Sequence, residues 1–538
     1  MLLPLVLSMQ AFNLVIVNAK IWTDGKLTPA TCMVVQGGRI AYVGPFTSRY
    51  STKSSRILDA HGRMVIPGLI DSHTHLVESG PTLVQLDLRD ATSQSDFLAR
   101  IRAYARKVPA GHWVVGSHWS AESWPERVPP NLADLDAAVG DHPAVFSRMD
   151  GHSELVNSLA LRQSRITAAG PADPPGGVID RDPTTHEPTG MLRERAQGLV
   201  PLPNPTPEES YEGLKAAIKM ANGYGVTSIA DICSVSDVPT WRRYFKENEP
   251  TIRTGLYFRT LYWELDVRRA KAVTPIAGWM EPRGLKAYMD GSLGSRTAFM
   301  HEPFSEQLAG KPADWRGVPM PGAIDGTYAR GFRLAADEDL QVIVHAIGDQ
   351  ANHDVLNLFA GIPNIQTRRF RVEHAQHLLP EDIQRFAKLG VIASMQPYHK
   401  ADDGRYCDRV IGAKRSRSSY AFRSLTKAGA TLAFGSDWDV VTIDPFAGIR
   451  TAVTGRIRTG KVWMPQENLT FDQALLGYTR NAAYAMKMEN EIGSLKRGYC
   501  ADFVILDGSP YRGESELAKV RPLSVFVDGR LVAGRQRL

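Results

Sequence analysis

The chain has no long apolar run, few cysteines and no strong excess of charge. No apolar stretch reaches the 18 or so residues that a membrane-spanning helix needs, so we expect no membrane partner. The 4 cysteines among 538 residues are far apart and lack CxxC spacing, which argues against a disulfide framework and favours buried free thiols. The formal net charge is +6, but the sequence contains no motif typical of nucleic-acid binding. We therefore interpret basic clusters such as residues 412–423 as solvated surface and expect no nucleic-acid partner.

The first residues, MLLPLVLSMQAF, are consistent with the remnant of a secretory signal that ends near Ala11. The segment lacks a positively charged start, and its apolar stretch of roughly seven residues is at the short end of signal-peptide length. We therefore expect a cytoplasmic protein. The alternative is a periplasmic or secreted protein from which a short N-terminal signal is removed.

Eight short apolar segments alternate with helical patterns through the middle of the chain. The apolar segments lie at residues 73–75, 226–232, 254–260, 284–290, 341–349, 370–376, 391–397 and 431–437. Several of the later spacers, such as ARGFRLAADEDL and EDIQRFAKLG, have the periodicity of helices. Alternating strands and helices predict a parallel sheet, and eight repeats predict closure into a barrel. We therefore predict an α/β fold with a (β/α)8 TIM barrel over residues 68–487.

The two ends of the chain carry short alternating strands rather than helices. Segments such as NLVIVNAKIWT near the start and ADFVILD near the end have this pattern, and neither end has enough core to fold alone. We predict that residues 1–67 and 488–538 together form one small β-sandwich beside the barrel.

Residues 80–205 form a large insertion after the first barrel strand, far longer than an ordinary loop between strand and helix. The insertion contains strands of its own, GHWVVGSHW and AVFSRMDG. Loops at the carboxyl ends of barrel strands carry function, so we predict a lid that determines specificity. The alternative is a structural cap or an oligomer interface. In the second case the partner would be another copy of this chain, in a homo-oligomer.

Side chains that can bind a metal stand at the ends of five of the predicted strands. His73 and His75 are two residues apart, so on a strand they point to the same side. The other strands end in Lys286, His345, His374 and Asp437. In a barrel, the carboxyl ends of all strands meet at one rim, so these side chains are expected to converge. Histidines without such a placement, His399 among them, are expected to be structural.

With these residues the chain resembles the amidohydrolase superfamily of metal-dependent hydrolases. Within it, the chain is similar to amidohydrolase family 3, the branch that contains N-substituted formamide deformylases. The resemblance rests on MVIPGLIDSHTHL, SRMDGHSELVNSLAL, GGVIDRDPTTHEPTGMLRERA, LKAYMDGSLGSRTA, VHAIGDQAN, RVEHAQ and FGSDWDV, which run from residue 65 to about residue 440. It implies the same barrel with a flanking β-sandwich, and it says almost nothing about the substrate.

The resemblance implies a binuclear metal centre. His73 and His75 would bind the first divalent ion, and His345 and His374 the second, each through a neutral imidazole. Asp437 at the end of the eighth strand would coordinate one of the ions. Zinc is favoured because imidazoles and hard oxygens suit it, although iron or manganese would bind as well.

Two neighbouring cations need a bridging anion, which a plain lysine cannot supply. Lys286 carboxylated by CO2 on its side-chain nitrogen becomes a carbamate with two oxygens, and burial favours the neutral amine that reacts. One alternative is a lysine that pairs with Asp290 or Asp349. The other is Cys233 after the second strand, because a cysteine at that place bridges the metals in the related D-aminoacylases and a thiolate binds zinc well.

These residues predict a metal-dependent hydrolase that acts on carbon–nitrogen bonds other than peptide bonds in a small-molecule substrate. A metal-activated hydroxide would attack an amide-type carbonyl, while Asp437 as general base takes the proton and hands it to the leaving amine. The alternative on the same fold is a mononuclear deaminase of a heterocycle, with Lys286 uncarboxylated. A catalytically inactive binding or regulatory protein is the alternative from a different class.

Four residues are candidates for substrate contacts. Asp150 and His152 end an apolar strand of the insertion, and His152 would hydrogen-bond a substrate carbonyl or a developing oxyanion, or merely cap a turn. Arg296 would clamp a substrate carboxylate or pair structurally with Asp290. Trp119 would line an apolar pocket wall, with core packing as its alternative.

Overall fold

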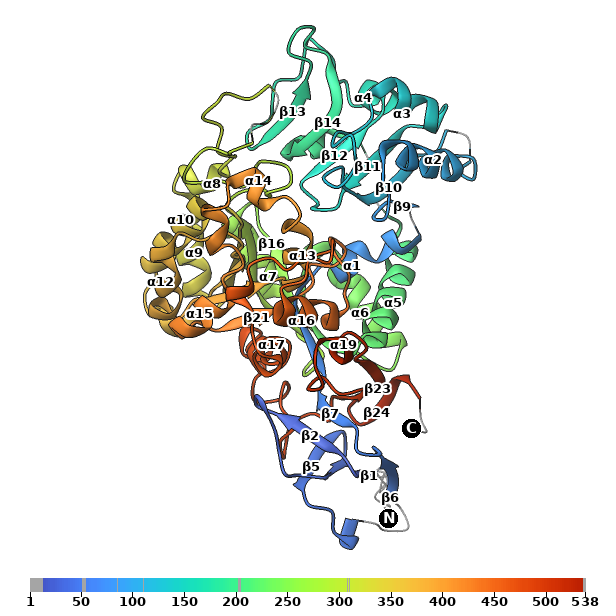
Figure 1. The fold of residues 1–538 in the computed structure, drawn as a ribbon, viewed down its shortest axis with the longest axis vertical. Helices are drawn as coiled ribbons and strands as arrows, with labels where there is room; N and C mark the ends of the chain where they lie inside the picture. Colours follow the sequence, from blue (N-terminus) through green and yellow to red (C-terminus); the bar gives the residue numbers. More distant parts are fainter. Residues whose placement is uncertain are drawn as a thin grey trace, which may run out of the picture.

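The computed structural model describes residues 13–50, 55–84, 86–109, 111–201, 205–306, 308 and 310–535. The segment considered above as a signal remnant lies outside these residues. Three parts follow one another along the long axis of the molecule: the insertion, the barrel and a pair of sheets near the chain ends (Figure 1). Within the described ranges, no helix combines the length and the apolar character that crossing a membrane requires.

Eight parallel strands form the central sheet, in the order β21-β20-β19-β18-β17-β16-β15-β8. Their bounds are β8 (Leu69–Thr74), β15 (Val226–Cys233), β16 (Arg253–Arg259), β17 (Met280–Tyr288), β18 (Gln341–Ala346), β19 (Arg371–His374), β20 (Ile392–Met395) and β21 (Leu432–Phe434). Backbone hydrogen bonds from Asp437 N to His73 O (2.7 Å) and from His75 N to Trp438 O (2.9 Å) join the chain at the ends of the two outer strands. The sheet is therefore nearly closed, which confirms the predicted α/β barrel.

Helices cover the outer face of this sheet. They include α5 (Pro207–Gly223), α6 (Val238–Glu247), α7 (Trp263–Ala272), α9 (Thr327–Asp337), α10 (Asp349–Ala360), α12 (Ile383–Leu389), α15 (Phe422–Ala428), α16 (Pro445–Thr454) and α17 (Phe471–Gly477). In contrast, α18 (Arg480–Ala485) packs against the inward-facing side chains of the strands. The largest apolar core lies between strands and helices, where Trp241 and Phe332 of the helices are buried with Phe258 of the sheet. This packing is expected when each helix presents one apolar stripe to the sheet.

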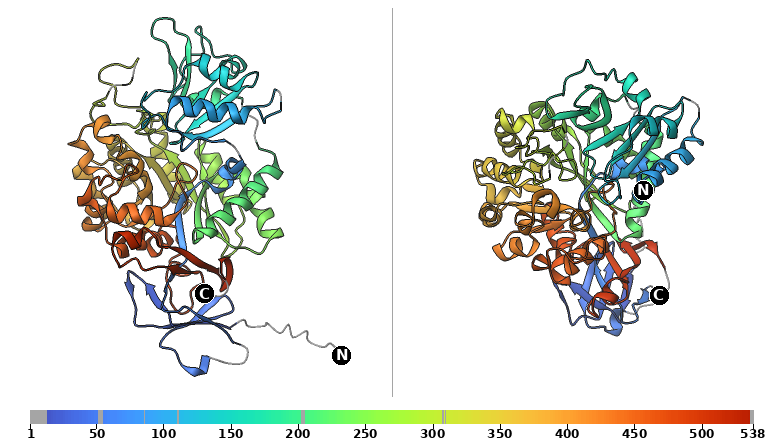
Figure 2. Two further views of the ribbon diagram at one scale, coloured as in Figure 1. Left: turned by 45° about the vertical axis from the view of Figure 1, so that its right-hand side comes forward. Right: turned by 45° about the horizontal axis from the view of Figure 1, so that its top comes forward.

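The insertion has its own sheet, with the order β13-β14-β12-β11-β10-β9. The strands are β9 (Leu86–Asp87), β10 (Val114–Trp119), β11 (Ala144–Arg148), β12 (Ser153–Val156), β13 (Gly177–Arg181) and β14 (Pro188–Glu194), and the helices are α2 (Gln94–Ala105), α3 (Leu132–Val139) and α4 (Ser158–Gln163). Figure 2 shows this layer over one end of the barrel, opposite the terminal sheets. The short helix α1 (Leu76–Ser79), directly after β8, leads the chain toward it.

Strands from both ends of the chain pair with one another at the other end of the barrel. One sheet has the order β5-β4-β1-β6, and the second the order β24-β23-β22-β7-β2-β3. In the second, β22 (Phe503–Asp507) runs antiparallel to β7 (Met64–Pro67), so the last strands of the chain join the first. The remaining strands are β1 (Asn13–Val17), β2 (Lys20–Thr23), β3 (Lys26–Leu27), β4 (Cys32–Gln36), β5 (Arg39–Gly44), β6 (Ser55–Asp59), β23 (Arg521–Val527) and β24 (Arg530–Gly534). The residue limits of this unit as a separate domain stay a prediction.

Candidate metal centre and its cavity

Three buried side chains at the carboxyl end of the barrel offer ligand atoms that all lie within 4.8 Å of one another. They are His73 at the end of β8, His374 at the end of β19, and Asp437 just beyond β21. The Oδ1 atom of Asp437 lies 3.3 Å from His73 Nε2 and 3.2 Å from His75 Nε2. The carboxylate therefore joins both histidines of the His-Thr-His motif.

The two remaining predicted ligands lie beside this group. The ring of His345 on β18 has its centroid 4.5 Å from that of His374, and Lys286 Nζ on β17 lies 3.4 Å from His73 Nε2. All six residues thus meet at one rim, as the strand-end rule predicts. Their roles as individual metal ligands stay predictions.

Three of the histidines have one ring nitrogen bonded to another acceptor of the protein. His345 Nε2 donates to the carbonyl oxygen of Gly291 (3.0 Å), and His374 Nδ1 donates to Gln396 Oε1 (2.8 Å). His73 Nδ1 donates to the carboxylate of Glu373. A metal-binding histidine characteristically donates its other N–H in this way, which fixes the tautomer and leaves one nitrogen free for a cation.

Glu373 and Arg371 support the centre from inside the barrel, and the sequence analysis did not identify them. Arg371 donates to both carboxylate oxygens of Glu373 at 2.7 and 2.9 Å. Burial opposes ionisation of Glu373, but Arg371 and His73 hold the pKa of its carboxyl at about 2. Two opposite charges spaced i, i+2 on an apolar strand share one face, so FRVEHAQ contained the signal for this pair.

Lys286 is buried, with 1% of its surface exposed. Within the part of the chain that the structure describes, no carboxylate forms an ion pair with it. Asp290 instead accepts backbone N–H groups of Ile347 and Gly348, and Asp349 accepts that of His301, so neither is the partner of the lysine. Burial lowers the pKa of Lys286 to about 8. The side chain therefore has the raised neutral fraction that reaction with CO2 requires.

Cys233 faces away from the histidines. It belongs to the apolar core between sheet and helices, together with Ile229 and Trp241, whereas Ala230 and Ile232 of the same strand belong to the cluster inside the barrel. Alternation along β15 therefore directs the thiol outward. This orientation removes the geometric basis for Cys233 as a bridging ligand.

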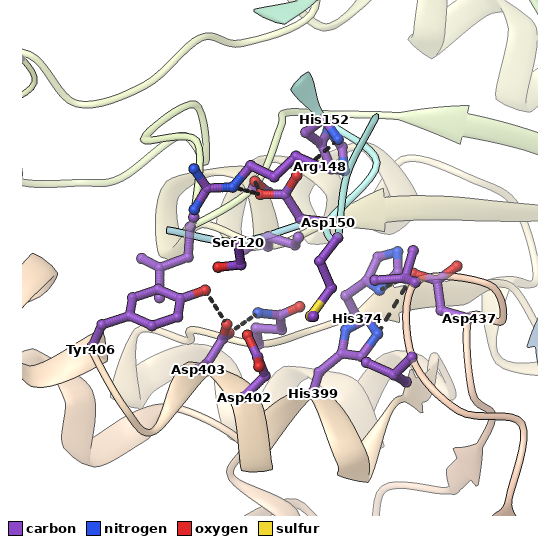
Figure 3. A pocket seen from close by; sticks show the side chains of 18 of the residues that line it. Ser120, Arg148, Asp150, His152, His374, His399, Asp402, Asp403, Tyr406 and Asp437 are labelled. Carbon is purple, nitrogen blue, oxygen red and sulfur yellow. Dashed lines mark hydrogen bonds and ion pairs between the residues drawn. The ribbon is translucent and has the colours of Figure 1, made fainter. Parts of the chain in front are cut away.

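A cavity opens beside the centre, between barrel and insertion (Figure 3). From the barrel it is lined by His345, His374, Asp437 and neighbouring residues, and from the insertion by Ser120, Arg148, Met149, Asp150 and His152. The predicted contacts Asp150 and His152 therefore reach the same space as the predicted ligands. The ring of His152 lies 4.9 Å from that of His345.

Arg296 and Trp119, the other two predicted substrate contacts, do not line this cavity. Arg296 binds Glu306 (2.6 Å) and Glu122 (3.5 Å) rather than Asp290. Trp119 has no exposed surface and donates its indole N–H to Phe146 O in the core of the insertion. Trp119 therefore packs in the core of the insertion, and Arg296 belongs to a network of ion pairs.

His399, which the sequence analysis assigned to structure, lies on the cavity wall. Its Nε2 is 3.9 Å from Asp437 Oδ2, and its ring lies at 8° to that of His374 with centroids 6.1 Å apart. Within the described ranges, this buried nitrogen has no hydrogen-bond partner. His399 is on α13 (Pro397–Asp403), directly after β20, so the strand-end rule used for the other histidines applied to it as well.

Comparison with known proteins agrees with the geometry of the site. Residues 56–533 match the sequence pattern of the amidohydrolase family. The chain is 34% identical to the protein LONG AFTER FAR-RED 3 of Arabidopsis thaliana, over 96% of this chain and 91% of that protein. It is 30% identical to the putative amidohydrolase YtcJ of Bacillus subtilis, over 95% of this chain and 96% of that protein.

One of the relatives has a name that states a reaction. The N-substituted formamide deformylase of Arthrobacter pascens is 27% identical over 97% of this chain and 98% of its own length. Among solved structures, an uncharacterised metal-dependent hydrolase from Pyrococcus horikoshii superimposes with a TM-score of 0.72 at 25% identity, over 93% of this chain and 99% of that chain.

Proposed function

Because the chain belongs to the amidohydrolase family, we propose that it is a metal-dependent hydrolase that cleaves a carbon–nitrogen bond, other than a peptide bond, in a small molecule. One observation carries the proposal: the ligand atoms of His73, His374 and Asp437 lie within 4.8 Å of one another, buried beside a cavity. Ordinary apolar core packing does not explain three such groups together, since a buried carboxylate among imidazoles is typical of sites where charges pair or bind a metal.

The donor set fits a divalent cation. Imidazole nitrogens and a carboxylate are ligands that zinc binds well, and three histidines already have their second nitrogens occupied. We propose that His73, His75, His345, His374 and Asp437 hold two ions. Carboxylated Lys286 would be the bridging ligand, which its burial and its lack of a carboxylate partner among the described residues support.

Divalent ions bound there would polarise a carbonyl group and lower the pKa of a coordinated water. Asp437 has the position and the charge to accept the proton of the attacking water. Burial opposes its ionisation, but His73 and His75 hold the pKa of its carboxyl well below the ordinary value. Because Asp437 also lines the cavity, it can pass the proton to the leaving nitrogen.

The insertion would contribute the other side of the substrate site. His152 lines the cavity next to His345, and we propose that it hydrogen-bonds the carbonyl oxygen of the substrate. Asp150 accepts the backbone N–H of His152 (3.0 Å) and so fixes this part of the loop. The likeness to a formamide deformylase makes N-substituted formamides the first amides to test.

The test combines metal analysis with a substrate panel. We expect purified protein to contain close to two divalent ions per chain, to hydrolyse at least one small amide such as N-benzylformamide, and to lose this activity on chelation. Re-addition of zinc should restore it. A fully metal-loaded protein that hydrolyses matched esters but no amide, carbamate or amidine would contradict the assignment to carbon–nitrogen bonds.

A further inference from the structure

His152 reaches the site from the insertion rather than from the barrel. It lies between β11 and β12, and in Figure 3 it stands with Arg148 and Asp150 across the cavity from His399 and Asp437. Its ring is close to His345, which belongs to the predicted metal ligands. A side chain carried by a separate layer must be held firmly if it is to contact a reacting group.

Glu194, the last residue of β14, holds the ring of His152. Its Oε2 atom lies 2.9 Å from His152 Nδ1, and its backbone N–H donates to His152 O at 3.0 Å. Glu194 has φ 51°, in the left-handed region that a non-glycine residue rarely adopts. Such a conformation costs of order 1–3 kcal/mol and persists only where the surroundings enforce it, often at functional sites.

The barrel loop after β17 fixes the same carboxylate from the other side. Thr297 Oγ1 donates to Glu194 Oε1 at 2.5 Å, so both carboxylate oxygens are engaged. A Cβ atom at Gly291 would overlap Glu194 Oε1, which explains a glycine at this position. The carbonyl of Gly291 also accepts the N–H of His345. One loop therefore orients a predicted metal ligand and the partner of His152.

We infer that Glu194 is a positioning residue that orients His152, so that the second ring nitrogen of His152 contacts the reacting amide. The inference rests on the proposed function, in which His152 contacts the substrate carbonyl. With Nδ1 engaged by Glu194, Nε2 is the ring nitrogen that remains for the substrate, and it can donate to the carbonyl oxygen when it carries a proton. The insertion would thus contribute to the chemical step.

The first experiment compares His152→Gln, Glu194→Gln and Asp180→Asn in metal-loaded protein with N-benzylformamide. Loss of a donor to a developing oxyanion costs about 10²–10³ in kcat, which we expect for His152→Gln. We expect about 10–100-fold for Glu194→Gln, the range for a partner that orients a functional histidine. Metal content and KM should change little. Asp180→Asn is the matched control, because Asp180 binds Arg193 (2.6 Å) in the same strands without touching His152.

The double variant separates positioning from a structural role. If Glu194 acts through His152, then Glu194→Gln in the His152→Gln background should lower kcat by less than about twofold. A full additional loss, or an equal loss in Asp180→Asn, would show that Glu194 only anchors the insertion and would overturn the inference.

A measurement without substrate keeps the inference distinct from the proposed function. With ¹⁵N-labelled histidine, the ring signal of His152, assigned from its absence in His152→Gln, should show a protonated Nδ1. This signal should change in Glu194→Gln and not in Asp180→Asn. An unchanged signal in Glu194→Gln overturns the inference even if amides are hydrolysed. Metal-loaded protein that hydrolyses no compound of the panel defeats the proposed function, while the ring signal still decides about Glu194.

Discussion

Replacement of Lys286 by methionine should have opposite effects on metal binding and on the stability of the metal-free protein. The amine is buried and has no carboxylate ion-pair partner within the described ranges, and its pKa falls from 10.5 to about 8. At about 1.36 kcal/mol per pKa unit, this shift corresponds to roughly 3 kcal/mol of destabilisation while the amine is protonated. Methionine has a similar length and no charge, so the variant removes this cost.

The sign of the pH dependence follows from the lowered pKa. The destabilisation is complete below pH 8 and disappears as the pH rises toward 10.5, where the amine is neutral in both the folded and the unfolded chain. Metal-free wild type should therefore gain stability over this range relative to Lys286→Met. At pH 7 the metal-free variant should melt a few degrees higher than wild type. With metal present the order should reverse, because the variant cannot form the bridging carbamate.

The assay is thermal unfolding in CO2-depleted buffer with chelator, combined with metal analysis after zinc loading. Lys400→Met is the matched control: Lys400 is also buried with its pKa lowered to about 8 by burial, but its Nζ donates to Met464 O and Asn468 Oδ1. That variant should retain its metal. Full zinc occupancy in Lys286→Met would refute the bridging role, and a lower melting temperature without metal would refute the argument from burial.

Two further substitutions test the general base and the insertion core. Asp437→Asn keeps the shape and one coordinating oxygen, so metal content should stay close to that of wild type. The value of kcat should fall by about 10²–10⁴. Normal kcat with metal bound would contradict the role of Asp437 as proton acceptor. Trp119→Phe loses the hydrogen bond to Phe146 O and part of the buried core. We therefore expect destabilisation by about 1–3 kcal/mol in thermal or denaturant unfolding. The relative rates on the amide panel should not change. A changed order of substrates would show that Trp119 influences the cavity.

The barrel and its rim could be predicted because both depend on local patterns. Short apolar segments that alternate with helical patterns predicted all eight barrel strands, and the rule that their carboxyl ends share one rim predicted which side chains would meet. His399 follows the same rule, two residues after the predicted strand 391–397. It was missed because it belongs to no motif, although its spacing from the strand end was sufficient evidence.

The supporting contacts could not be predicted, because they join residues far apart in the sequence. Glu373 and His73 are 300 residues apart, and Arg296 and Glu122 are 174 apart. No local pattern shows which of several carboxylates a given arginine will meet. The position of Trp119 depends on which face of β10 packs inside the insertion. The aromatic residues near Trp119 in the sequence did not indicate which face this would be.

The structure separates the predicted metal centre from the predicted substrate wall. The six predicted ligands all belong to the barrel, whereas Asp150 and His152 belong to the insertion. Several contacts join the halves at the loop after β17, and two of them lie next to His152: Ser292 Oγ donates to Asp150 Oδ2 at 2.9 Å, and Thr297 binds Glu194. Substitutions in the insertion that keep these two contacts should therefore alter substrate preference and leave metal affinity intact. Substitutions in the loop should affect both, because Gly291 in that loop orients His345.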